Sequence, residues 1–257
     1  MSTATVDRTR EEKIEVATTY LDGLRSRKGD GIRLAPDVSR KGNGVITTRG
    51  EEAIRAGMVH EPVAAITGLR WIVDGDNAVA FYDLDTTFEV PVYLAERFLI
   101  RDGLIHEIEF VFSTDQSKGP RPERPRRDAD RGAPGPCTLG NDPCVQWTAL
   151  QYLGALLSHD GSRVPLAPDA WRIENGHDTG QGDGIRDALA NDVMNVIGRL
   201  DGMRWFIEGD QAAVFYELHA TIGLPDGMAP PPPMPIAERF RVQNGLIKEI
   251  EAIFSLP

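Results

Sequence analysis

The sequence predicts an α+β fold that occurs twice along one chain, each copy having N-terminal helices that pack on a curved antiparallel sheet. Three observations predict it: an internal repeat that spans most of the 257 residues, a helix-periodic segment at the start of each copy, and a series of strand-like runs after it. Because domains cluster around 100–150 residues, a chain of this length suits two domains of ordinary size.

The repeat is clearest in two blocks that align between the copies. Residues Gly68–Asp85 match Gly202–His219 with nine identities in 18 positions. Residues Ala95–Ser113 match Ala237–Ser255 with 12 identities in 19. Identity this dense at corresponding places predicts two copies of the same folding unit.

The segment between the copies has a composition that cannot form a core. From Lys118 to Pro143 it holds six prolines and five arginines and almost no aliphatic residues. We interpret it as a tether. The expected organisation is therefore an N-terminal tail at 1–15, a first domain at 16–115, a Pro/Arg-rich linker at 116–146 and a second domain at 147–257.

Each copy is expected to open with an amphipathic helix. Apolar residues recur at the spacing i, i+3, i+4, i+7, which places them on one helical face. In the first copy these residues are Ala17, Tyr20, Leu21 and Leu24, and in the second Ala149, Tyr152, Leu153 and Leu156.

The remaining elements follow in the same order in both copies. An Ala-Pro-Asp entry that ends at Asn-Gly predicts a short strand at Asp37–Asn43 and Asp169–Asn175. Short helices are expected within Glu51–Met58 and Asp183–Val196. Runs of β-forming residues separated by turn signals then predict, in the first copy, strands at Thr67–Val73, Ala78–Phe88, Val92–Arg101 and Leu104–Phe112.

Composition argues against several functional classes. With 28 basic and 39 acidic residues the net charge is −11, which disfavours binding to a nucleic-acid backbone. No apolar run approaches the roughly 18 residues of a membrane span, and the N-terminus has no apolar signal segment. We therefore expect a cytoplasmic protein with neither nucleic acid nor membrane as a partner.

The two cysteines, Cys137 and Cys144, have six residues between them and lie in the linker. A zinc site would need a second Cys or His pair, so no metal role is expected. A turn-like stretch separates the two residues, so a local disulfide is geometrically feasible, whereas free thiols are the commoner state inside cells.

The element order, the Ala-Pro-Asp entry and the closing Gly-Leu-Ile-x-Glu-Ile-Glu hairpin resemble the nuclear transport factor 2-like superfamily. Its enzyme branches include SnoaL-like polyketide cyclases, limonene epoxide hydrolase, ketosteroid isomerase and scytalone dehydratase. The resemblance covers residues 16–113 and 148–255. It implies a cone-shaped domain in which helices close one face of a curved sheet over a deep apolar pocket, with no cofactor.

The resemblance also suggests site residues. Period-2 alternation puts Phe81, Asp83 and Asp85 on one strand face and Tyr82 on the other. Alignment with the epoxide-hydrolase branch makes the first set the pocket face. The same alignment places Arg40 in the pocket, and we expect Phe110 there as an apolar wall. The corresponding residues of the second copy are Phe215, Glu217, His219 and Arg172, and Glu174 stands where the first copy has Gly42.

The second copy is chemically richer, so we expect it to carry any activity. Glu174, Glu217, His219 and Arg172 form its candidate catalytic set, in which a carboxylate removes a proton and the histidine returns one. The first copy is expected to bind substrate or support the fold. One departure from the family is clear: Phe110 and Ala252 stand where the cyclase and epoxide-hydrolase branches carry a catalytic Asp, unless a bulge turns Glu109 or Glu251 inward.

Two functions stay open at this point. One is a cofactor-free enzyme that isomerises, hydrates, dehydrates, cyclises or opens an epoxide in a largely apolar small molecule. The other is a non-catalytic ligand-binding or scaffolding module, in which duplication supplies an internal pseudo-dimer that needs no further copy. In either case a Pro-rich loop, Ile222–Met234, is expected over the mouth of the second pocket.

Overall fold

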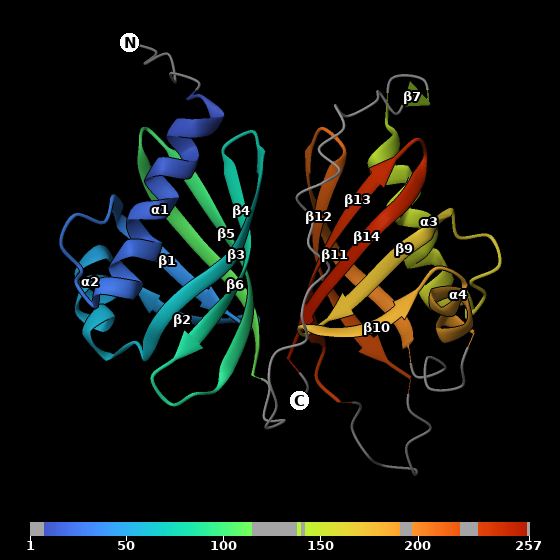
Figure 1. The fold of residues 1–257 in the computed structure, drawn as a ribbon. Coiled ribbons are helices and arrows are strands. Elements are labelled where there is room, and N and C mark those ends of the chain that lie inside the picture. The colour runs from blue at the N-terminus through green and yellow to red at the C-terminus, as the bar shows by residue number, and fades with distance from the viewer. Residues whose placement is uncertain (1–7, 115–137, 140–141, 191–196, 222–230, 256–257) are drawn as a thin grey trace. The chain divides into compact units, whose positions relative to one another are not determined.

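The computed structural model of the protein describes residues 8–114, 138–139, 142–190, 197–221 and 231–255. The chain divides into two units, Met1–Ser117 and Lys118–Pro257, which we call the first and second domains. Each domain is α+β, with one long N-terminal helix across a six-stranded sheet, so the predicted tandem fold is confirmed (Figure 1).

The elements of the two domains correspond one to one along most of their length. The first domain comprises α1 (Arg10–Ser26), β1 (Leu34–Gly42), β2 (Val45–Arg49), α2 (Glu51–Gly57), a 3₁₀ turn (Met58–His60), β3 (Val63–Asp74), β4 (Asn77–Thr86), β5 (Pro91–Arg101) and β6 (Leu104–Thr114). The second comprises β7 (Thr138–Leu139), β8 (Asp142–Pro143), α3 (Cys144–Ser158), β9 (Leu166–Glu174), β10 (His177–Gln181), α4 (Asp183–Leu189), β11 (Ile197–Glu208), β12 (Gln211–Ala220), β13 (Met234–Gln243) and β14 (Leu246–Phe254).

Helix α1 begins earlier than its apolar pattern indicated. A capping box sets its start: Glu12 N–H donates to Thr9 Oγ1, and Thr9 N–H donates back to the Glu12 carboxylate. The first turns are therefore helical although they lie in the segment expected to be a tail. The helix ends where Arg27 adopts a left-handed conformation.

The same aromatic contact fixes the long helix on the sheet in both domains. The rings of Tyr20 and Phe98 lie edge to face at 5.6 Å, and those of Tyr152 and Phe240 lie likewise at 5.5 Å. Both tyrosines are buried within the core cluster of their domain. We call the side of each sheet that α1 or α3 covers the helix face.

The strand order is β2-β1-β6-β5-β4-β3 in the first sheet and β10-β9-β14-β13-β12-β11 in the second. Every neighbouring pair is antiparallel except β1–β6 and β9–β14, which are parallel, so each sheet is mixed where a purely antiparallel one was expected. The parallel pair joins the first and last long strands of a domain. It brings Gly42 opposite Phe110, and Glu174 opposite Ala252.

Bulges interrupt β3 and β11, the strands that occupy equivalent places in the two domains. The register shifts between Thr67 and Arg70 in β3 and between Asp201 and Arg204 in β11. A glycine with positive φ lies inside each, Gly68 at 63° and Gly202 at 64°. Such bulges bend a strand and increase its twist, as a curved sheet requires.

Two short strands, β2 and β10, were not predicted. Their residues, Val45–Arg49 and His177–Gln181, contain few apolar side chains and are mostly exposed. Each is an edge strand that pairs on one side only, so it shows no hydrophobic alternation. No helix in the described ranges is both long enough and apolar enough to cross a membrane.

Candidate functional site

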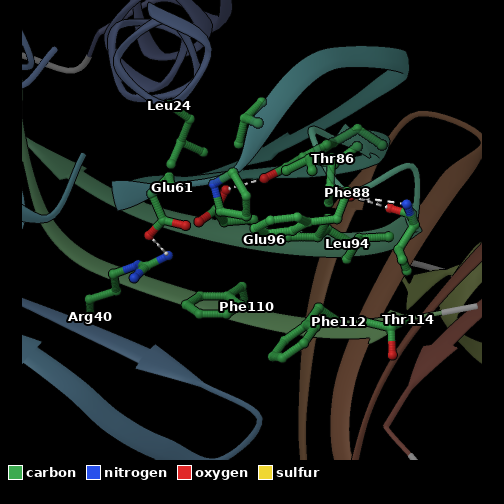
Figure 2. A pocket seen from close by; sticks show the side chains of 16 residues that line it. Leu24, Arg40, Glu61, Thr86, Phe88, Leu94, Glu96, Phe110, Phe112 and Thr114 are labelled. Carbon is green, nitrogen blue, oxygen red and sulfur yellow. Dashed lines mark hydrogen bonds and ion pairs between the residues drawn. The ribbon is translucent and has the colours of Figure 1, made fainter. Parts of the chain in front are cut away.

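A cavity of about 500 Å³ lies in the first domain, between the sheet and the segment that follows the 3₁₀ turn. That volume falls in the usual range for small-molecule sites. Most of the wall is apolar, and Figure 2 shows Phe88, Leu94, Phe110 and Phe112 along it. The ionisable side chains of the lining are Arg40, Glu61, Tyr82 and Glu96.

Tyr82 and Glu96 form a buried hydrogen-bonded pair. They lie on the neighbouring strands β4 and β5, and Tyr82 Oη donates to Glu96 Oε2 over 2.7 Å. Burial raises the pKa of Glu96 to about 7, although the Tyr82 hydrogen bond and the Arg40 charge lower it. Burial also raises the pKa of Tyr82 well above its ordinary value, so the phenol stays protonated. The cavity therefore holds a carboxyl group that exchanges its proton near neutral pH.

Arg40 supplies the positive charge of the site. Its Nη2 lies 3.2 Å from Glu61 Oε1, and its guanidinium lies over the Phe110 ring, 4.7 Å from the ring centroid. Figure 2 shows the Arg40–Glu61 ion pair at the same end of the cavity as Glu96. The buried Arg40 Nε and the buried Tyr20 hydroxyl have no partner of ordinary hydrogen-bond geometry. The two groups lie close to each other, since Arg40 partly offsets the rise in the pKa that burial causes in the Tyr20 hydroxyl.

The second domain repeats the core of this arrangement. Tyr216 Oη donates to Glu238 Oε2 over 3.1 Å, and burial together with the Glu174 charge raises the pKa of Glu238 to about 8. Arg172 lies beside Tyr152, as Arg40 lies near Tyr20 in the first domain. Each domain thus buries two tyrosines, one arginine and one glutamate on its helix face.

The environment of the arginine differs between the domains. Arg172 Nε donates to Thr179 Oγ1 over 2.9 Å, its Nη2 donates to Thr179 O over 3.1 Å, and its Nη1 donates to Tyr152 Oη over 3.4 Å. Glu174 Oε1 lies 3.7 Å from Arg172 Nε. Arg172 therefore makes three hydrogen bonds within the protein, whereas the Arg40 guanidinium pairs with Glu61 and stacks on Phe110 at the cavity wall.

The predicted pocket face of the fourth strand is wrong. Tyr82 lines the cavity, and alternation sends Phe81, Asp83 and Asp85 to the opposite face of the sheet. The two faces were confused because both are buried along this strand, so hydrophobicity does not distinguish them.

In the second domain, too, the predicted pocket face of the strand is the face turned away from the helix. Tyr216 belongs to the helix-face core, and Phe215 contacts Phe206 at 5.9 Å on the other side. Glu217 is exposed, and His219 pairs with Asp201 at 3.2 Å. The expected convergence of these groups with Glu174 is therefore also wrong, since Glu174 lies with Arg172 on the helix face.

Other predicted residues do lie near one another. Arg40 and Phe110 line the cavity of the first domain, and Arg172 and Glu174 adjoin each other in the second. Glu96 lies in the cavity and its neighbour Arg97 on the opposite face, as alternation predicts for such a pair.

No bulge turns Glu109 or Glu251 inward. Arg97 holds Glu109 at 3.3 Å and Glu107 at 2.7 Å on the opposite face. Arg239 holds Glu251 at 3.2 Å and Glu249 at 2.7 Å in the same way. These arginine–carboxylate clusters cross-link neighbouring strands and take no part in the cavity.

Sequence reasoning missed Tyr20, Glu61, Tyr82 and Glu96 as members of the site. For three of them a signal was present, because Tyr20, Tyr82 and Glu96 are identical to Tyr152, Tyr216 and Glu238 in the second copy. The candidate catalytic residues were instead those that differ between the copies. Glu61 carried no such signal, since it follows a 3₁₀ turn and reaches Arg40 only through the tertiary fold.

Among the described residues, no group of three or more His, Cys, Asp or Glu side chains is placed to hold a metal ion. Cys144 is disulfide-bonded, and Cys137 lies outside the described residues. Most of the Pro-rich loop, residues 222–230, also lies outside them.

Comparison with known families gives one match, which covers residues 6–112 and 142–254 and has the description "Domain of unknown function (DUF8021)". The chain belongs to this family. A search of curated proteins finds no match.

Three solved structures illustrate what each domain is similar to. A candidate ketosteroid isomerase from Kribbella flavida is 20% identical, with a TM-score of 0.37, over 47% of this chain and 87% of the other. An NTF-2 like protein of unknown function from Burkholderia xenovorans is 18% identical, with a TM-score of 0.37, over 43% and 88%. A candidate SnoaL-like polyketide cyclase from Jannaschia sp. is 17% identical, with a TM-score of 0.35, over 46% and 91%.

Proposed function

We propose that the first domain is an acid/base catalytic site for a small, largely apolar substrate. The observation that carries the proposal is the Glu96 carboxyl group at one end of an apolar cavity, hydrogen-bonded to Tyr82 and with a pKa of about 7. A group that transfers protons most effectively has a pKa near the working pH, and burial is the usual way to bring a glutamate there.

Each polar group has a role that follows from its chemistry. Glu96 in its ionised form takes a proton from the substrate and, once protonated, returns it to another atom. Tyr82 stays protonated because its pKa is raised; its single O–H is donated to Glu96 while that carboxylate is ionised, and it becomes available to a substrate oxygen once Glu96 has taken up the proton. Arg40 lines the same cavity and adds a fixed positive charge.

Moving a proton between two atoms of one molecule is an isomerisation, and the reaction needs only the side chains named. Proton delivery by the same carboxyl group also supports the dehydration, hydration, cyclisation and epoxide-opening reactions considered from the sequence. Isomerisation requires the fewest additional groups, so we take it as the primary proposal.

Exchange with deuterium oxide tests the proposal without knowledge of the natural substrate. The intact protein would be incubated in deuterium oxide with a panel of small cyclic ketones, and deuterium at the carbon next to the carbonyl would be measured by NMR. We expect catalysed exchange in at least one ketone. Glu96→Gln should reduce its rate about 10²- to 10⁴-fold, the usual loss for a general acid/base.

The second domain supplies the matched control, because Glu238 forms the same tyrosine pair. Glu238→Gln should leave the exchange rate within about twofold if catalysis belongs to the first domain. A loss of about half of the rate in each variant would show two working sites of similar activity. Binding of ketones with no exchange in the wild type would contradict catalysis and favour the ligand-binding alternative.

A further inference from the structure

The two domains differ at one pair of positions that face each other across the parallel strands. Gly42 and Phe110 are register partners in the first domain, and Glu174 and Ala252 are register partners in the second. The surrounding pairing is the same, since Arg40 lies opposite Ile108 and Arg172 opposite Ile250. The small residue of the pair is therefore on the first strand in the first domain and on the last strand in the second, where the larger residue is a glutamate. The pairing of the two strands is the same in both domains.

In the first domain the pair is sterically coupled. A methyl group at Gly42 would lie 2.4 Å from Phe110 Cζ, a distance that atoms in folded proteins do not tolerate. Only glycine leaves room for the ring where it lies. There the ring contacts the Arg40 guanidinium at 4.7 Å and Phe112 at 5.9 Å. The ring thus forms part of the cavity wall beside the arginine.

In the second domain the same place holds a carboxylate. Glu174 lies 3.7 Å from Arg172 Nε, and Thr179 accepts the hydrogen bond from that nitrogen. Thr47, the residue that corresponds to Thr179, donates to the backbone carbonyl of Arg40 over 3.2 Å, as Thr179 does to that of Arg172 over 3.5 Å; Thr179 differs in also accepting from the arginine Nε. Thr179 therefore holds the Arg172 guanidinium within the protein, whereas the Arg40 guanidinium pairs with Glu61 and lines the cavity.

We infer that the Gly42–Phe110 pair determines the ligand specificity of the first domain, selecting a molecule with an apolar body and one oxygen that accepts a hydrogen bond from Arg40. The inference rests on the function proposed above and names its substrate class. The apolar body packs on Phe110 and Phe112, and the oxygen accepts a hydrogen bond from the part of the Arg40 guanidinium that lines the cavity. The Glu174–Ala252 pair gives the second domain a closed polar network that does not accept such a ligand.

Two probes of the same shape test the inference: 2-acetylnaphthalene, which carries one carbonyl oxygen, and 2-ethylnaphthalene, which carries none. Calorimetric titration of the intact wild-type protein should give one site per chain. It should bind the acetyl probe about tenfold more tightly than the ethyl probe, because a charged donor contributes strongly to a hydrogen bond.

The exchange variant Gly42→Glu/Phe110→Ala installs the residues of the second domain in the same register. We expect it to bind both probes at least tenfold more weakly while keeping the circular dichroism spectrum of the wild type. Gly42→Ala should weaken binding too, since the added methyl displaces the ring. Gly57→Ala is its control, because no atom lies within 4 Å of the added methyl there, and should leave binding unchanged.

The outcomes separate the two proposals. A wild type that binds neither probe overturns the proposed site and this inference with it. Wild-type binding that survives in the exchange variant, or equal affinity for the two probes, overturns the inference and leaves the proposed function standing. Two sites per chain would show that the second domain accepts the same ligand, which the inference forbids.

Discussion

The two domains share a buried set of two tyrosines, one arginine and one glutamate, but they use the arginine differently. In the first domain Arg40 stacks on Phe110 in the wall of a cavity and pairs with Glu61. In the second, Arg172 is tied to Thr179 and lies against Glu174. The comparison teaches that duplicated sites can diverge through one pair of facing residues while the ionisable core stays the same. The predictions below test that comparison, from the largest expected effect to the smallest.

The largest effect should come from the arginines of the opposite face. Arg239→Met would remove the arginine that pairs with buried Glu251, at 0% exposure, and one of the two arginines that pair with Glu249, at 7% exposure, and should cost about 3–5 kcal/mol of stability. Arg97→Met should cost less, because Glu107 is 48% exposed and can be hydrated. Hydrogen exchange followed by mass spectrometry reports each domain separately. A greater loss from Arg97→Met would contradict the reasoning.

The buried glutamates should make stability depend on pH. Burial raises the pKa of Glu96 to about 7 and that of Glu238 to about 8, from 4.5 in an unperturbed glutamate. Between these values the folded state holds a proton that the unfolded state has released. The stabilisation is therefore complete below about pH 4.5 and is lost as pH rises through 7 or 8.

At most about 1.4 kcal/mol is lost for each pH unit between the folded and unfolded pKa values, so the second domain should lose more than the first. Urea unfolding between pH 5 and 8 measures this loss of stability, and hydrogen exchange assigns it to one domain or the other. Glu96→Gln and Glu238→Gln should each flatten the dependence in their own domain. Stability independent of pH in the wild type would show that these carboxyls stay ionised.

A smaller effect should separate the two threonines. Thr179→Val removes the hydroxyl oxygen that accepts a hydrogen bond from Arg172 Nε. It should cost about 1–3 kcal/mol of stability, because a buried charged donor loses its partner. Thr47→Val should cost a few tenths of a kcal/mol, since the Thr47 hydroxyl donates only to a backbone carbonyl at the surface. Thermal unfolding of both variants measures the difference, and equal losses would mean that Thr179 does not hold the arginine.

The smallest effect concerns glycines in the long helices. Gly154→Ala adds a methyl into open space within α3 and should stabilise the second domain by about 0.5–1 kcal/mol. Gly23→Ala should gain less or lose stability, because the methyl would lie 2.6 Å from Ile32 Cδ1. Comparing the two by urea unfolding checks how tightly each helix packs.

The sequence by itself determined the duplication, the order of elements and the turns. Those features depend on local patterns, such as the helical spacing around Tyr20 and the Asp-Gly and Asn-Gly turns. It also indicated that Glu96 and Arg97 point to opposite faces, because alternation along a strand is a local property.

Which face of a strand meets the cavity was decided only by the tertiary structure. Along β4 both Phe81 and Tyr82 are buried, so period-2 alternation gives two sets of residues and no criterion for choosing between them. The choice is made by α1, whose Tyr20 packs on the same face as Tyr82 and Phe98. The site itself joins residues 20, 40, 61, 82 and 96, and only the packing of a helix, a turn and three strands brings side chains so far apart in sequence around one cavity.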